Sequence, residues 1–119
     1  MLIVDDSIMI GEKIREYISE LENINIIGHA LSGLEAIQFI SEQVPDIILL
    51  DINMPGLNGF DVLTWIRNRF IQTTVIMLTN HSSPNYRQKS SGLGADYFFD
   101  KTTEFEKLPD LINRLFENK

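Results

Sequence analysis

Short apolar runs alternate along this chain with longer segments in which apolar residues recur every three or four positions. The short runs cover residues 2–4, 24–30, 47–50, 74–79 and 97–99. Their lengths, and their many β-branched and aromatic residues, are typical of strands in a buried sheet. The sequence therefore predicts five strands, each followed by a helix.

Polar and turn residues mark where these helices begin and end. Ser7, Ser32, Asn58 and Ser83 are the expected N-caps, and Pro45 ends the second helix. The spacing of apolar residues then predicts one buried stripe on each of four helices. Those stripes are Ile10, Ile14, Ile18 and Leu21; Ala36, Ile37, Ile40 and Val44; Phe60, Leu63, Ile66 and Phe70; and Leu108, Leu111, Ile112, Leu115 and Phe116.

The last two helices are the least regular. Between residues 85 and 91 the one large apolar side chain is Tyr86, which predicts a marginal fourth helix. Pro109 fits the first turn of the last helix, so residues 103–107 are expected to form a short separate turn.

Strict alternation of strands and helices indicates an α/β fold, in which helices cover both faces of a parallel sheet. With five strands, the better match is a flavodoxin-like (βα)5 doubly wound parallel sheet in strand order 2-1-3-4-5. The length suits one domain over residues 1–119.

Composition narrows the classes of function. The net charge of −7, with scattered basic residues, argues against direct nucleic-acid binding. No apolar run is long enough to span a membrane, and no secretory signal precedes Asp5. The chain has no cysteine. We therefore expect a cytoplasmic protein without a membrane partner.

Chemistry-bearing residues stand at four of the predicted strand ends. Asp5 and Asp6 follow the first strand, Asp51 the third, Thr79 closes the fourth, and Lys101 lies just after the fifth. Ligands of such sheets bind beyond the carboxyl ends of the strands, near the switch point. Taken singly, each residue has a structural explanation, but together they favour a site.

The residue types in this set suit a phosphoryl group. Crowded carboxylates repel unless a cation lies among them, and Mg²⁺ prefers oxygen ligands. An ammonium and a hydroxyl can bind phosphoryl oxygens, while a remaining carboxylate attacks phosphorus. The strand ends therefore predict a Mg²⁺-assisted phosphoryl site.

Four segments of the chain resemble the receiver domains of two-component response regulators, including the chemotaxis type. The resemblance covers essentially the whole chain, and the segment around Asp51 is the most specific. The segments are LIVDDS at 2–7, IILLDINMPGLNG at 47–59, MLT at 77–79 and GADYFFDK at 94–101.

The resemblance implies a phospho-acceptor switch rather than an enzyme. Asp51 would take a phosphoryl group from a sensor histidine kinase or a phosphotransfer protein. Asp5, Asp6, Asp51 and the backbone carbonyl of Asn53 would hold Mg²⁺.

The same resemblance implies how the signal leaves the site. Thr79 would bind the phosphoryl oxygen, and Lys101 would pair with Asp51 and then with the phosphoryl group. Phe98 would be the aromatic switch; an ordinary core aromatic is the alternative. The output surface for an unknown downstream protein, or for a homodimer, would be formed by the fourth helix, fifth strand and fifth helix.

Three residues depart from the family pattern. Thr102 replaces the usual proline after Lys101, which leaves the placement of that lysine open. Asn80 stands where a small residue is usual, and His81 follows it. Together with Asn53, these two residues are expected to alter the lifetime of the acyl phosphate, in a direction that the sequence does not give.

Other readings remain open. A degenerate receiver would bind proteins without taking phosphate. An aspartyl-phosphate phosphatase would need a general acid at the position of Asn53, and a flavin-binding protein would meet repulsion from Asp5 and Asp6. The chain is either a stand-alone receiver or part of a longer regulator; residues 117–119 do not resemble a linker, which slightly favours the former.

Overall fold

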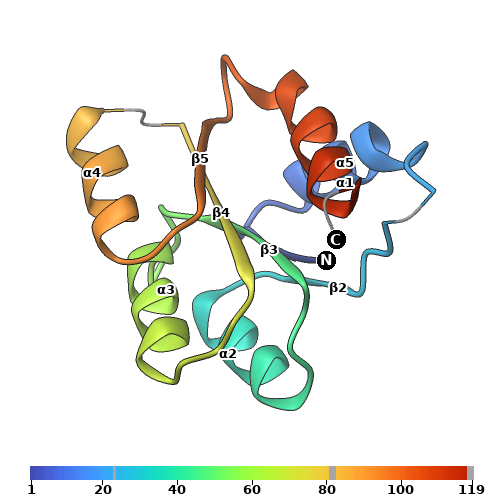
Figure 1. The fold of residues 1–119 in the computed structure, drawn as a ribbon. Coiled ribbons are helices and arrows are strands. Elements are labelled where there is room, and N and C mark those ends of the chain that lie inside the picture. The colour runs from blue at the N-terminus through green and yellow to red at the C-terminus, as the bar shows by residue number, and fades with distance from the viewer. Residues whose placement is uncertain (23, 81–82, 118–119) are drawn as a thin grey trace.

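A parallel five-stranded sheet forms the centre of the computed structural model, which describes residues 1–22, 24–80 and 83–117 (Figure 1). The strand order is β2-β1-β3-β4-β5, so the predicted fold class and order are confirmed. The strands are β1 (Leu2–Val4), β2 (Gly28–Ala30), β3 (Ile47–Asp51), β4 (Thr74–Thr79) and β5 (Tyr97–Asp100). The helices are α1 (Ile8–Ile18), α2 (Gly33–Glu42), α3 (Gly59–Asn68), α4 (Pro84–Gly92), the 3-10 turn η1 (Phe105–Lys107) and α5 (Leu108–Glu117).

Two hydrophobic cores lie on opposite faces of this sheet. Successive residues of a strand point to opposite faces, so Ile48 and Leu50 of β3 enter one core while Ile47 and Leu49 enter the other. Helices α2, α3 and α4 cover the first face, and α1 and α5 pack together over the second (Figure 1). Within the described ranges, no helix has both the length and the apolarity needed to cross a membrane.

The predicted N-caps are all present. Ser7, Ser32 and Ser83 accept hydrogen bonds from backbone amides of the first turns of α1, α2 and α4. Asn58 and Asp61 exchange reciprocal bonds at the start of α3.

Helix α4 buries a single residue, Ser90, which agrees with its weak pattern. The separate turn before the last helix is confirmed as η1.

The second strand is shorter than predicted. The pattern indicated residues 24–30, whereas β2 covers Gly28–Ala30. The reason lies in its neighbour: Leu2 is paired with Gly28, and the amide of Ile27 already reaches the carbonyl of Met1. Residues 24–26 therefore lie beyond the amino end of β1 and form no ladder, and Ile24 and Ile26 pack against the core as loop residues.

Three predicted helix-face residues lie outside their helices. Leu21 follows the end of α1 and still packs on the core, whereas Val44 follows α2 and is exposed. Phe70 is 90% exposed with a φ of 56°, because it adopts the left-handed conformation that ends α3. Ile71 packs against the core in its place. The side chain of Phe116 lies outside the described part of the chain.

Candidate functional site

The predicted site residues meet at the carboxyl edge of the sheet. A pocket of about 260 Å³ there is lined by Asp5, Asp6, Ser7, Ile10, Asp51, Asn53, Asn80 and Lys101. The parallel register brings them together, because β1, β3, β4 and β5 all end at this edge. Thr79 lies buried next to the pocket, and His81 lies outside the described residues.

Three carboxylates converge in this pocket. One oxygen each of Asp5, Asp6 and Asp51 lies within 4.8 Å of the others. Asp5 and Asp51 are buried, whereas Asp6 is exposed to solvent. An all-oxygen set open on one side fits a hard divalent cation that keeps several waters, as Mg²⁺ does. The cluster can therefore hold a metal ion.

Lys101 is the fixed cation of the site. Its buried ammonium donates to Asp5 Oδ2 at 2.5 Å and lies 3.1 Å from Asp51 Oδ1. The expected pairing with Asp51 is present, and the contact with Asp5 is an addition that the sequence did not indicate. One ammonium thus faces three carboxylates, so the site has an excess of negative charge.

Burial perturbs the ionisation of Asp51. The side chain loses most of its water, which raises the pKa of Asp51 from 3.8 to about 6. Lys101 opposes this shift, and the charges of Asp5 and Asp6 add to it. At neutral pH Asp51 is still ionised, and Lys101 compensates its charge only in part.

A hydrogen-bonded turn holds Lys101 in place. Its amide donates to the carbonyl of Thr79 at 2.8 Å. The buried Asp100 carboxylate accepts from the amide of Thr102 at 2.7 Å and also from the Thr102 hydroxyl. Thr102 therefore fixes this loop through an N–H that proline lacks. The prediction missed Asp100, although an Asp followed two residues later by Thr is a turn signal.

Gly59 lets the chain pass close to the backbone at the end of β3. A Cβ atom on Gly59 would lie 2.3 Å from the carbonyl oxygen of Asp51 and 2.7 Å from Cα of Ile52. Its amide donates to the carbonyl of Ile52 at 2.8 Å. The loop after β3 is thereby folded tightly back. No role of Gly59 was predicted, although glycine near a strand can mark a close approach of two backbone segments.

Thr79 and Phe98 link the pocket to α4. Asn53 donates its side-chain amide to the Thr79 hydroxyl at 3.3 Å. Phe98 packs, partly buried, against the core on the α4 face, and the Arg87 guanidinium lies 4.6 Å from its ring centre. Arg87 also pairs with Glu104 at 2.7 Å. Phe98 is thus placed between the core and a charged residue of α4.

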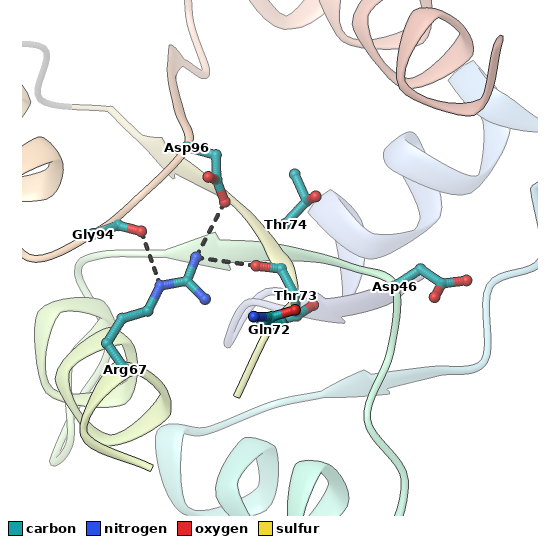
Figure 2. A pocket seen from close by; sticks show the side chains of 7 residues that line it. All are labelled: Asp46, Arg67, Gln72, Thr73, Thr74, Gly94 and Asp96. Carbon is teal, nitrogen blue, oxygen red and sulfur yellow. Dashed lines mark hydrogen bonds and ion pairs between the residues drawn. The ribbon is translucent and has the colours of Figure 1, made fainter. Parts of the chain in front are cut away.

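A second pocket, of about 490 Å³, lies at the amino edge of the sheet (Figure 2). Arg67 points into it and donates to the carbonyls of Gly94, Ile71 and Thr73 at 2.9–3.0 Å. It also pairs with Asp96 at 3.1 Å. These bonds tie the end of α3 to the loops before β4 and β5, so this cluster is a structural junction.

The chain matches proteins of known family over its whole length. The family described as response regulator receiver domain matches residues 1–113. Response regulator protein VraR of Staphylococcus epidermidis is 31% identical over 119 residues, which is 100% of this chain and 57% of that protein. The chain thus spans about half the length of the curated relatives that it matches.

Solved structures agree with the sequence matches. A DNA-binding response regulator of the LuxR family from Staphylococcus aureus superposes with a TM-score of 0.85 at 31% identity, covering 95% of each chain. CheY in a complex with CheX, BeF3 and magnesium from Borrelia burgdorferi gives 0.86 at 29% identity, covering 97% and 87%. The chain belongs to the response regulator receiver domains of two-component systems.

Proposed function

We propose that Asp51 accepts a phosphoryl group from the phosphohistidine of a sensor histidine kinase or phosphotransfer protein. Mg²⁺ would be held by Asp5, Asp6, Asp51 and the backbone carbonyl of Asn53. The observation that carries the proposal is the excess of negative charge at the carboxyl edge. Three carboxylates lie within 4.8 Å of one another there, and Lys101 bridges Asp5 and Asp51.

The proposed transfer uses groups already in place. A carboxylate oxygen of Asp51 attacks phosphorus, the P–N bond of the donor breaks, and the imidazole leaves with the electron pair. Lys101, 3.1 Å from Asp51, is positioned to follow the negative charge onto the phosphoryl oxygens. The Thr79 hydroxyl donates a further hydrogen bond. Mg²⁺ supplies charge neutralisation of these oxygens when it is bound.

The surface beside the pocket suits a protein donor. Helix α1 begins at the site, where Ile10 lines the pocket and Ile8 and Met9 are 60% and 79% exposed. Apolar side chains presented at the rim of a polar site are typical of protein contacts. The chain then serves as a phosphoacceptor and not as an enzyme with a separate substrate. The proposed location is the cytoplasm.

The proposed output runs through Phe98 to the surface formed by α4, β5 and α5. Thr79 leaves its bond to Asn53 when it turns toward the phosphoryl group, and Phe98 moves into the space vacated. The Arg87 stack on Phe98 and the Arg87–Glu104 pair are then disturbed. A downstream protein or a second copy of the chain reads the changed surface.

Intact-mass measurement tests the proposal. We expect the protein incubated with Mg²⁺ and acetyl phosphate to gain the mass of one phosphoryl group. The Asp51→Asn variant and a sample with EDTA should gain none. Absence of any gain, together with failure to bind beryllofluoride, would reject the switch and favour the degenerate protein-binding receiver.

A further inference from the structure

His29 of the edge strand β2 contacts the backbone of Asp5, a residue that lines the acidic pocket. It lies in the middle of β2, opposite Ile3 of β1, and its ring is partly buried. Its Nε2 atom lies 2.8 Å from the backbone carbonyl oxygen of Asp5. Because a carbonyl can only accept, Nε2 carries the hydrogen and donates it to Asp5.

Gly11 of α1 leaves the space that the His29 ring occupies. A Cβ atom on Gly11 would lie 2.3 Å from Cε1 and 2.4 Å from Nδ1 of the ring. Such contacts are far inside van der Waals range, so any larger residue at this position displaces the imidazole. The imidazole ring thus packs directly against Gly11 of α1, and this packing fixes the direction of the Nε2–H bond.

The bond from His29 completes the anchoring of Asp5. The Asp5 amide donates to the carbonyl of Ala30 at 3.1 Å, and its carboxylate accepts from the amide of Ser7 at 2.8 Å and from Lys101. The carbonyl that His29 holds belongs to the peptide group joining Asp5 to Asp6. The bond from His29 therefore acts directly on the orientation of that peptide, while the other bonds hold the Asp5 amide and side chain.

Asp6 has no comparable support of its own. Its side chain is exposed and forms no hydrogen bond or ion pair with another residue in the described part of the chain. The direction in which its carboxylate leaves the backbone is therefore set by the Asp5–Asp6 peptide.

We propose that His29, seated on Gly11, is a positioning residue that directs the Asp6 carboxylate toward the metal. This inference rests on the proposed Mg²⁺-dependent function. His29 touches neither the metal nor the phosphoryl group, and it acts through the backbone of Asp5. Hydrogen-bonded groups behind metal ligands commonly change metal affinity by about 10- to 100-fold.

Two substitutions separate the hydrogen bond from the packing of the ring. His29→Phe keeps a ring against Gly11 but has no donor, whereas His29→Gln offers an amide N–H at a similar reach. Mg²⁺ affinity, followed through amide chemical shifts of the full chain, should fall about tenfold in His29→Phe. In His29→Gln it should stay within about threefold of the wild type.

A second pair of variants tests the packing of the His29 ring against Gly11. Gly11→Ala should weaken Mg²⁺ binding in the wild-type background, because it pushes the imidazole away. In a His29→Ala background the same change should have no further effect, since the space is then empty. This cycle compares folded proteins even if the phenylalanine variant is unstable.

The outcomes distinguish the two proposals. Equal Mg²⁺ affinity of the wild type and His29→Phe, with a loss of melting temperature alone, would reduce His29 to a packing residue and overturn the inference. Additive effects of the Gly11 and His29 changes would do the same. Failure of the wild type itself to bind Mg²⁺ would reject the proposed function, and this inference with it.

Discussion

The two edges of the sheet each hold a cation among polar groups, and they differ in how far the charges are matched. At the amino edge, Arg67 meets three carbonyls and the carboxylate of Asp96. At the carboxyl edge, Lys101 faces Asp5, Asp51 and the nearby Asp6. The amino edge has the larger pocket, about 490 against 260 Å³. Unmatched charge, and not pocket size, therefore distinguishes the carboxyl edge, where the proposed site lies.

Chemical type explains the difference between the two cations. The planar guanidinium of Arg67 presents several N–H groups in fixed directions, which suits a permanent junction between loops. The ammonium of Lys101 is a compact charge on a flexible stem, which can follow a negative charge as it moves. One edge is suited to stability and the other to exchange of ligands.

The largest expected effect comes from breaking the amino edge. Arg67→Ala leaves three carbonyls without this donor and Asp96 without its ion pair, and should lower the free energy of unfolding by about 4 kcal/mol. Urea denaturation measures this loss. The exposed Arg69, stacked on Trp65, is the matched control, and Arg69→Ala should cost less than about 1 kcal/mol. Equal losses in both variants would refute the structural role of Arg67.

Removing the acceptor charge should stabilise the metal-free protein. The pKa of Asp51 rises from 3.8 unfolded to about 6 folded, so the folded state binds more protons between these values. Its contribution to stability is complete below about pH 4 and is lost as pH rises through about 6. Asp51→Asn should abolish this dependence and add about 3 kcal/mol above that window.

Denaturation at several pH values without Mg²⁺ measures this effect. The control is Asp96→Asn, which removes a carboxylate from the amino edge and should leave the pH dependence between about 4 and 6 in place. If the free energy of unfolding changed with pH in the same way in the wild type and in Asp51→Asn, burial would not perturb the pKa of Asp51.

Removing the fixed cation should strengthen metal binding while it slows phosphoryl acceptance. Lys101→Met leaves Asp5 and Asp51 without their ammonium, so the pocket becomes more negative and Mg²⁺ should bind about tenfold tighter. Titration calorimetry measures the affinity, with the exposed Lys107→Met as control. Weaker Mg²⁺ binding in Lys101→Met would mean that Lys101 mainly shapes the pocket.

The smallest expected effect concerns the end of α3, next to the Arg67 junction. Phe70 holds a left-handed conformation with its side chain 90% exposed. Phe70→Gly relieves that strain at some cost in chain entropy, for a net gain of about 0.5–1 kcal/mol. Thermal denaturation measures the gain. A loss of stability would indicate that the phenyl ring makes favourable contacts in solution.

Local patterns predicted most of the fold. Strict alternation gave the five strands, and the N-caps gave the starts of the first four helices, because these signals depend on neighbouring residues alone. The errors arose where contacts between distant segments decide the ends of a strand or helix. Ile24 and Ile26 continue the apolar run of the second strand but lie beyond the amino end of β1, and Phe70 fits the helical period but lies after the end of α3.

In the candidate site, too, some features were predictable from the sequence pattern and others depend on tertiary contacts. Asp51, Thr79 and Lys101 were predictable because parallel strands bring their carboxyl ends together. The bond from Lys101 to Asp5, the Asp100 turn and the seat of His29 on Gly11 were not predicted. Each joins residues through side-chain geometry that no spacing in the sequence encodes.

A Mg²⁺ titration followed residue by residue by NMR tests the central claim most directly. We predict saturable amide shifts around Asp5, Asp6 and Asp51, with the loops around Arg67 and Asp96 unchanged, and loss of these shifts in Asp6→Asn. Saturable shifts at the Arg67 edge, or none at the carboxyl edge, would contradict the account.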